Sequence, residues 1–410
     1  MSDCCSAPGL KPFNEALSQM LAQVSPITET LTLPIAQAMN YVLAQDIASP
    51  LNVPPHDNSA MDGYAFAINS LSASKTLKLV GRSMAGAPFQ GECNAGECIR
   101  IMTGAKMPAG CDSVEMQENV SVAGEQISFL QEKTFGSHVR NAGEDIQINQ
   151  QVLQQGHRIT AVDIGVLASL GVAEVKVFRK LKVALIATGD ELKLPGQALE
   201  SGDIHESNSF VLAAMLNKLH VEVINFGIIE DDLAAITAAF VSADEQADAV
   251  ISSGGVSVGD ADYTKTVLDD LGEIAFWKIA MKPGKPFAFG KLKNSVFFGL
   301  PGNPVSALVT FHQLALVALT KMQNAQALKR THIKVKCCTA LKKSPGRMDF
   351  QRGILSVNEH GETVVASTGS QGSGILSSLA KANCFIILAS EQGKLAAGEM
   401  VEVQLFDEFL

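Results

Sequence analysis

No stretch of this 410-residue sequence approaches the roughly 18 consecutive apolar residues of a membrane-spanning helix, and no basic N-terminal segment leads into an apolar one. Charged residues make up only 18 %, and the formal net charge is −10. A chain this acidic is not expected to bind nucleic acid or an anionic membrane through its whole surface. We therefore expect a cytoplasmic protein of roughly two to four domains, in which a local group of cations meets any anionic ligand.

The eight cysteines form no CxxC pair, and four of them stand in two adjacent doublets. This spacing is a poor basis for a zinc site or a disulfide framework, so we interpret the cysteines as free thiols in a reducing compartment. Cys4 and Cys5, near the N-terminus, have no assigned role.

Common nucleotide-binding motifs are also missing. Gly254 and Gly259 have the spacing of a Walker A loop, but Asp260 stands where that motif requires lysine. No GxGxxG sequence follows an apolar strand, and the eight histidines include no HExxH pair. A P-loop is therefore excluded, and nothing favours a dinucleotide site or a zinc peptidase.

The segment 248–265 combines a strand, a glycine loop, carboxylates and the start of a helix. Ala249–Ile251 is an apolar run typical of a buried parallel strand. Ser252–Gly255 follow, and their small side chains allow a tight turn with exposed N–H groups. A helical pattern begins near Tyr263. Such a unit can hold a phosphorylated ligand with a divalent cation, although glycine-rich turns are about as often only structural.

Three more apolar strands in this region end in acidic or Gly/Pro-rich loops: Val183–Ala187, Val221–Phe226 and Ser295–Leu300. Helical segments separate them, which predicts a doubly wound, mostly parallel α/β domain. Because the carboxyl ends of parallel strands share one edge of a sheet, we expect the four loops to form one ligand site.

Carboxylates recur in these loops: Glu191, Asp231, Asp260 and Asp262, with Asp190 as a neighbour. Acidic side chains also favour helix N-termini, which accounts for one or two of them but not readily for one at every strand end. Carboxylates beside phosphate-binding loops repel an anionic ligand. We therefore expect Mg²⁺ to bridge them.

The segment Lys278–Pro286 carries three lysines between two prolines and a glycine. Prolines exclude a helix here, so the ammonium groups are held in a rigid, extended segment. A solvated hairpin turn is the alternative. The flanking Phe276, Trp277, Phe287 and Phe289 favour a packed segment, and its lysines fit an oxyanion or a phosphoryl group.

The rest of the chain predicts three further parts. Phe13–Val24 has the apolar spacing of a helix, and a second helix is expected over Pro34–Ala44. A proline-rich loop over Ser49–Tyr64 precedes short strands between residues 76 and 159, which indicate a small inserted β-domain. A helix is expected over Ala161–Leu170, capped by Thr160. After Arg330 the pattern predicts a final β-barrel or sandwich.

Taken in order, seven motifs of this sequence resemble those of the molybdopterin molybdenumtransferase family, which includes MoeA and the E-domain of gephyrin. They cover essentially the full chain, and together they are far more specific than any one of them. The motifs are Asp57–Tyr64, Ile101–Gly104, Gly143–Asp145, Thr188–Glu191, Ser252–Gly259, Met281–Pro286 and Gly299–Ser306.

The resemblance implies four domains in an elongated homodimer. Residues 1–50 and 141–179 would form an N-terminal mixed helical dimerisation domain, and 51–140 an inserted β-domain. Residues 180–328 would form the α/β molybdopterin-binding domain, and 329–410 a C-terminal β-barrel. In this family the active site lies between the α/β domain of one subunit and the inserted β-domain of the other.

The implied enzyme takes adenylylated molybdopterin and molybdate, releases AMP and leaves molybdenum on the pterin dithiolene, with Mg²⁺ assisting. By motif position the catalytic residues would be Asp62, Thr103, Asp145, Glu191, Asp231, Asp262, Lys278 and Lys282, with Glu191, Asp231 and Asp262 as metal ligands. Lys282, Lys285, Pro286 and Ser306 match the segment proposed to hold molybdate, with looser matches at Arg347 and Ser373. Further binding residues would be Arg140, Ser253, Gly254, Gly255, Ser257, Pro301, Gly302, Asn303 and Pro304.

Two other functions stay open at this point. A molybdopterin adenylyltransferase resembles the α/β domain and shares its glycine loop, but it needs only that one domain. A non-catalytic scaffold would have no use for an intact acidic and lysine set. The sequence also leaves open molybdate against tungstate, and partners such as the adenylyltransferase or a downstream cofactor carrier.

Overall fold

The computed structural model describes residues 10–255 and 263–410. Cys4, Cys5, Ser257, Asp260 and Asp262 therefore lie outside the described residues. The chain divides into two compact units. Unit 1 comprises Met1–Leu31, Asn40–Val42 and Val177–Leu410, and unit 2 comprises Thr32–Met39 and Leu43–Lys176. The four domain boundaries expected within these units remain a prediction.

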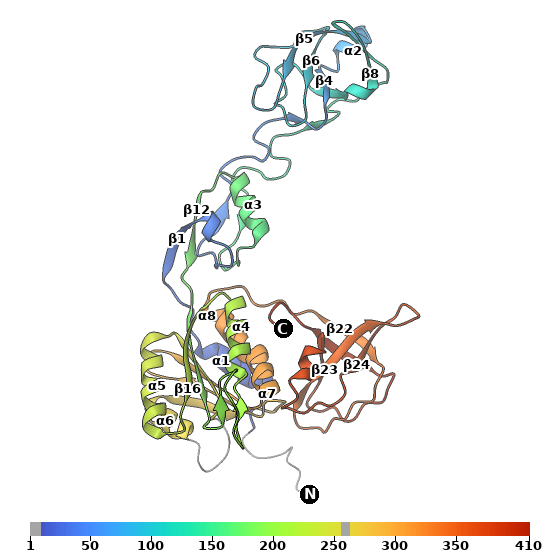
Figure 1. Ribbon diagram of the computed structural model, residues 1–410. Coiled ribbons are helices and arrows are strands. Elements are labelled where there is room, and N and C mark those ends of the chain that lie inside the picture. The colour runs from blue at the N-terminus through green and yellow to red at the C-terminus, as the bar shows by residue number, and fades with distance from the viewer. Residues whose placement is uncertain (1–9, 256–262) are drawn as a thin grey trace. The chain divides into compact units, whose positions relative to one another are not determined.

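Unit 1 contains a six-stranded, mostly parallel sheet, which confirms the predicted doubly wound domain (Figure 1). Four parallel strands are followed at one edge by two strands that pair antiparallel. In spatial order the strands are β16 (Glu222–Ile229), β13 (Lys182–Thr188), β17 (Ala249–Ser253), β21 (Val296–Leu300), β20 (Pro286–Lys291) and β18 (Glu273–Lys278).

Helices cover both faces of this sheet. One face carries α5 (Leu233–Gln246) and α6 (Tyr263–Leu271), and the other carries α4 (Asn208–Lys218) and α7 (Pro304–Thr310). The central strands β13, β17 and β21 read as nearly continuous apolar runs because both of their faces are buried. Phe240 of α5 and Phe297 of β21 are fully buried, with ring centroids 5.6 Å apart.

The register of the parallel strands aligns their carboxyl ends. Ala187 lies opposite Ser253, and Ser253 lies opposite Leu300. Thr188, the last residue of β13, lies opposite Ile229, the last residue of β16. The loops that follow these four strands therefore leave the sheet at one edge.

Helix α7 continues through a π-helical turn (Phe311–Ala315) into α8 (Leu316–Met322). Within the described part of the chain, this Pro304–Met322 segment is the one helix long and apolar enough to cross a membrane. However, 89 % of its most apolar window is buried inside the protein, as in the core helix of a folded domain.

The π-helical turn carries a buried polar network. His312 is fully buried, and its Nε2 lies 2.9 Å from a carboxylate oxygen of Asp407. Arg330 donates to Oε1 of Gln313 at 2.9 Å. Burial lowers the pKa of His312, although the hydrogen bond with Asp407 opposes this shift. His312 is therefore held neutral at physiological pH.

This network predicts a pH dependence of stability. A histidine whose pKa is lowered by folding stabilises the protein above its ordinary pKa, and that contribution is lost as the pH falls below about 6.5. We expect His312→Gln to reduce the drop in unfolding temperature between about pH 7.5 and pH 5.5. Thermal unfolding of the wild type and of His312→Gln at both pH values measures this drop. The same drop in both proteins would contradict the prediction.

Residues beyond 331 form a closed five-stranded barrel, as predicted. The barrel closes because β23 pairs with both β24 and β25. Its strands are β22 (His332–Cys337), β23 (Met348–Val357), β24 (Thr363–Ser367), β25 (Cys384–Leu388) and β26 (Met400–Leu405), with a short helix α9 (Ser377–Ala380). The two-residue strand β19 (Met281–Lys282) pairs parallel with β23, so the lysine segment is joined to the barrel.

Unit 2 contains a second six-stranded sheet, which agrees with the predicted small β-domain. In spatial order its strands are β7 (Ser113–Met116), β4 (Gly63–Phe66), β6 (Glu97–Ile101), β5 (Thr76–Ser83), β9 (Gln126–Phe129) and β8 (Val120–Ala123), with helices α2 (Ser70–Ala73) and η2 (Gln117–Asn119). The expected loop over Ser49–Tyr64 ends in β4, whose four residues are all buried between β6 and β7.

The prediction of a helix over Pro34–Ala44 is wrong. The structure has strand β1 (Thr30–Pro34), which pairs with β12 (Glu174–Phe178), and then a single 3₁₀ turn, η1 (Ile35–Gln37). Asn40, with φ of 68°, has left the helical region. Proline at the start of a helical pattern is compatible with one short turn as well as with a long helix, and pairing with β12 decides between them.

Two predicted helices are confirmed: α1 (Phe13–Gln23) and α3 (Ala161–Ser169). Thr160 caps α3 in a capping box with Asp163. The remaining elements are two-stranded pairs: β2 (Ile47–Ala48) with β11 (Gln151–Leu153), β3 (Asn58–Ser59) with β10 (Val139–Arg140), and β14 (Leu192–Lys193) with β15 (Ile204–His205).

Candidate functional site

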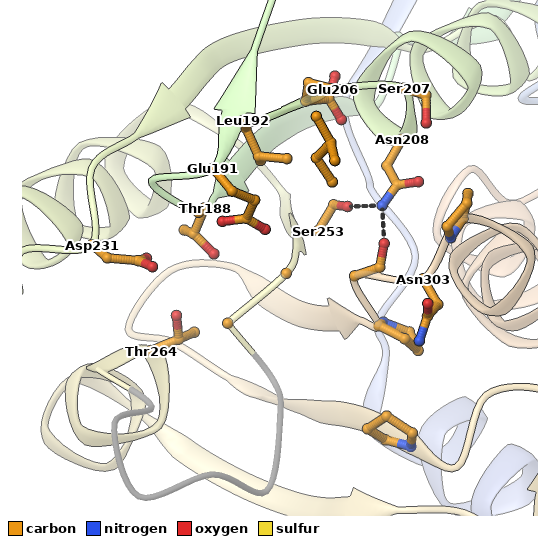
Figure 2. A pocket seen from close by; sticks show the side chains of 18 of the residues that line it. Thr188, Glu191, Leu192, Glu206, Ser207, Asn208, Asp231, Ser253, Thr264 and Asn303 are labelled. Carbon is orange, nitrogen blue, oxygen red and sulfur yellow. Dashed lines mark hydrogen bonds between the residues drawn. The ribbon is translucent and has the colours of Figure 1, made fainter. Parts of the chain in front are cut away.

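The strand ends of the α/β sheet surround a pocket of about 820 Å³ in unit 1 (Figure 2). The loops after β13, β16, β17 and β21 all contribute, as the sequence predicts. Ten of the predicted site residues line it: Glu191, Asp231, Ser253, Gly254, Gly255, Pro286, Pro301, Gly302, Asn303 and Pro304.

The glycine loop can exist only with glycine at its centre. Gly254 and Gly255 have φ of 94° and 65°, in the left-handed region. A Cβ on Gly254 would lie 2.5 Å from the carbonyl oxygen of Thr188, and one on Gly255 would lie 2.2 Å from Oγ1 of Thr264. The loop therefore packs directly on the end of β13 and the start of α6, which leaves its backbone bordering the pocket.

Two carboxylates, Glu191 and Asp231, point into the pocket (Figure 2). Burial and the charges of Asp190 and Glu191 raise the pKa of Asp231 above its ordinary value. The neighbouring Asp232 caps α5 by accepting from the N–H of Ala235 at 2.9 Å. Capping is therefore done by Asp232, and Asp231 stays in a cluster of negative charge that a divalent cation would neutralise.

The predicted metal ligands are only partly brought together. Across residues 10–255 and 263–410, no three carboxylate, histidine or cysteine side chains lie close enough together to hold a metal ion. Glu191 and Asp231 supply hard oxygen donors at one pocket, which suit Mg²⁺. The third expected ligand, Asp262, lies outside the described residues.

Two buried polar residues of this pocket were not predicted from the sequence. Glu206 is only 4 % exposed, and its carboxylate accepts from the N–H of Ser209 at the start of α4. Asn208 is 8 % exposed and donates to Oγ of Ser253 and to the carbonyl of Gly302, each at 2.8 Å. The sequence pattern that could have predicted them is the polar run Glu206–Ser209 at the start of a helix.

A second, smaller cavity of about 60 Å³ lies between the lysine segment and the barrel. Lys282, Lys343 and Arg347 supply three cations, and Asp349 supplies one carboxylate. The register places Lys282 directly opposite Asp349. Lys343 is 5 % exposed and donates to the carbonyl oxygens of Ser344 and Arg347, at 2.8 and 2.7 Å, which fixes this loop.

The expected single site is thus divided between two cavities. The carboxylates line the larger one and Lys282 lines the smaller. Lys282 and Pro286 are four residues apart, so at most about 14 Å of chain separates them, and Pro286 borders the larger cavity. An anion at Lys282 can therefore lie within one small-molecule length of a ligand in the larger pocket.

Among the described residues of unit 1, four predicted site residues line neither cavity. Lys278 and Lys285 are partly exposed, and Lys278 lies opposite Pro286 in the sheet. Ser306 is buried in α7, where its carbonyl accepts from Thr310. The carbonyl of Ser373 accepts from the N–H of Val305 at 3.0 Å, so this residue reaches the start of α7 through its backbone.

Asp349 is expected to hold the ammonium of Lys282 in place. Its carboxylate lies 3.5 Å from Nζ of Lys282 and accepts from Gln351 at 3.1 Å. Asp349→Asn removes the charge but keeps the shape, so Lys282 should lose its fixed position. We expect the KM for the oxyanion of this cavity, molybdate if the family resemblance holds, to rise about tenfold, with kcat changed less. Asp269→Asn, on the exposed side of α6, is a matched control, and an unchanged KM in Asp349→Asn would contradict the role.

The site residues of unit 2 form a separate group. Oδ1 of Asp62 accepts from both the N–H and the hydroxyl of Thr103, each at 2.7 Å. These hydrogen bonds hold the pKa of Asp62 below its ordinary value, so this carboxylate is ionised. Arg140 and Asp145 line a pocket of about 500 Å³ with Asn58 and Glu144.

Three family models match successive parts of the chain. They are the MoeA N-terminal region (domain I and II) over residues 11–171, a probable molybdopterin binding domain over 184–321 and the MoeA C-terminal region (domain IV) over 334–406.

Known proteins match over nearly the whole length. The chain is 48 % identical to a molybdopterin molybdenumtransferase of Haemophilus influenzae, over 97 % of this chain and 99 % of the relative. It is 32 % identical to molybdopterin molybdenumtransferase 2 of Mycobacterium tuberculosis, over 94 % and 97 %. The crystal structure of a molybdopterin biosynthesis MoeA protein from Pyrococcus horikoshii superposes with a TM-score of 0.83 at 29 % identity, over 97 % and 100 %. This chain therefore belongs to the MoeA family of molybdopterin molybdenumtransferases.

Proposed function

We propose that this protein is a transferase of molybdenum cofactor biosynthesis that inserts molybdenum from molybdate into adenylylated molybdopterin and releases AMP. The observation that carries the proposal is the pairing of two cavities. The larger is bordered by a glycine loop and carboxylates and suits a phosphorylated ligand, and the smaller is lined by three cations and suits an oxyanion.

The residues divide into three roles. The N–H of Gly254 donates to the carbonyl of Leu300, so the N–H groups of Gly255, Gly302 and Asn303 would bind the phosphate and pterin portions. Lys282 and Arg347 would hold molybdate, supported by Lys343 and Asp349. Glu191 and Asp231 would hold Mg²⁺, which supplies positive charge to the phosphate oxygens when bound. Holding both anions side by side raises their effective concentration.

The test supplies the protein with adenylylated molybdopterin, molybdate and Mg²⁺. AMP and a pterin carrying molybdenum on its dithiolene are the expected products. Formation of adenylylated pterin from ATP and molybdopterin would instead indicate an adenylyltransferase. Binding without any turnover would indicate a scaffold.

We also propose that the enzyme is a cytoplasmic homodimer whose active site takes Asp62, Thr103, Arg140 and Asp145 from the partner subunit. The ionised carboxylate of Asp62 is hydrogen-bonded to Thr103 near the surface, which suits a second ligand-binding element. The family resemblance supplies the dimeric arrangement.

Mixing two inactive variants tests this shared site. Asp62→Ala and Glu191→Gln should each be inactive alone, because each dimer then lacks a necessary residue at both sites. Unfolded and refolded together, the mixture should recover about a quarter of the wild-type activity, since half of the dimers regain one intact site. No recovery, with mixed dimers present, would show that both residues act within one subunit.

A further inference from the structure

Asn208, the first residue of α4, joins two loops of the larger pocket. Its Nδ2 donates to Oγ of Ser253, at the end of β17, and to the carbonyl of Gly302, after β21 (Figure 2). The two loops lie in contact, because a Cβ on Gly302 would lie 3.8 Å from Cα of Gly254. One buried amide thus connects three elements of the site.

The chemistry of the partners fixes the orientation of this amide. A backbone carbonyl can only accept a hydrogen bond, so the atom of Asn208 that faces Gly302 must be the NH₂ group. That group has two hydrogens, and Ser253 and Gly302 receive one each. The direction of the bond to Ser253 follows: Asn208 donates and the serine oxygen accepts.

This direction determines what the Ser253 hydroxyl can offer a ligand. A hydroxyl can accept hydrogen bonds and also donate one. Because Asn208 supplies the bond that Oγ accepts, the hydrogen of Ser253 remains available for donation. Among the described residues, Oγ of Ser253 has no other hydrogen-bond partner, and Ser253 lines the pocket.

We propose that Asn208 is a positioning residue that turns the Ser253 hydroxyl into a hydrogen-bond donor for an anionic phosphate oxygen of the ligand. The inference rests on the proposed function, in that the ligand of this pocket carries a phosphate. Asn208 also holds the loop over residues 301–304 at a fixed distance from the glycine loop.

Replacing Asn208 by aspartate reverses this hydrogen bond. Aspartate has nearly the same shape, but its ionised carboxylate has no hydrogens to donate. It would accept the hydrogen of Ser253, so that the ligand loses its donor, and it would place negative charge beside the carbonyl of Gly302. Asn208→Asp should therefore act at least as strongly as Ser253→Ala.

The test compares AMP with adenosine, which lacks only the phosphate. By calorimetry, Asn208→Asp and Ser253→Ala should each weaken AMP binding roughly ten- to a hundredfold, the range for a lost hydrogen bond to a charged group. Adenosine binding should change less than about twofold. Asn217→Asp, the same replacement at an exposed position of α4, is the matched control and should bind both ligands normally.

A double replacement separates orientation from general support of the fold. If Asn208 acts through the hydroxyl, Asn208→Asp should cost much less AMP affinity in a Ser253→Ala background than in the wild type. Equal loss of affinity for AMP and adenosine, or fully additive effects of the two replacements, would overturn the proposal. If Asn208→Asp does not fold, unchanged AMP binding by Ser253→Ala would overturn it. Failure of the wild-type protein to bind AMP would overturn the proposed function as well.

Discussion

Glu191→Gln is expected to lower the rate of AMP release about 100- to 1000-fold, because the glutamine keeps the shape of the side chain but loses its charge. Glu191 lines the larger pocket with Asp231, and its charge contributes to the raised pKa of Asp231. Removing one of these two carboxylates should leave too little negative charge to hold a divalent cation beside the phosphate.

The measurement is single-turnover AMP release, together with Mn²⁺ binding by calorimetry in the absence of substrate. Glu191→Gln should lose both activity and Mn²⁺ affinity while unfolding at the same temperature as the wild type. Asp232→Asn is a matched control: it removes a negative charge next to Asp231, and asparagine still caps α5. Normal Mn²⁺ binding and normal turnover in Glu191→Gln would remove this residue from the site.

Lys282→Gln is expected to raise the KM for molybdate about 100-fold or more. Its ammonium borders the small cavity with Lys343 and Arg347. Lys343 already donates to two backbone carbonyls, so it cannot readily take over the role of Lys282. A dianion in a partly enclosed cavity depends strongly on each cation near it, since charge-assisted hydrogen bonds are about twice as strong as neutral ones.

Initial rates at increasing molybdate concentration measure this effect. Lys291→Gln, at the exposed end of β20 farthest from Pro286, also removes one positive charge but does not line the small cavity, and it should leave the KM unchanged. Because the defect of Lys282→Gln lies in binding, high molybdate should restore part of the rate. An unchanged KM would show that molybdate binds elsewhere.

The sheet and its larger pocket could be predicted from the sequence because parallel strands obey a simple rule. Glu191 and Asp231 are 40 residues apart, yet each follows a strand, and β13 and β16 pair in register to their last residues. Adjacent parallel strands necessarily place their carboxyl ends side by side. The strand pattern beyond Arg330 predicted a barrel or a sandwich, and the pairing of β23 with both β24 and β25 decides for the barrel.

Other features depend on contacts between segments that are distant in the sequence, and no local sequence pattern predicts such contacts. Asp349 reaches Lys282 only because β19 pairs with the barrel strand β23, and no pattern within a two-residue strand predicts its partner. Asn208 could be placed at a helix start, but not directed at Ser253 and Gly302. The incorrect prediction of a helix over Pro34–Ala44 has the same origin, because the chain enters it from β1, which ends at Pro34 and pairs with β12.

The dependence of AMP release on molybdate tests the central claim most directly, namely that two anions held in neighbouring cavities react with each other. In a single turnover, the wild-type protein with adenylylated molybdopterin and Mg²⁺ should release AMP only when molybdate is added, one AMP for each molybdenum bound to the pterin. Release of AMP at the same rate without molybdate would contradict the account.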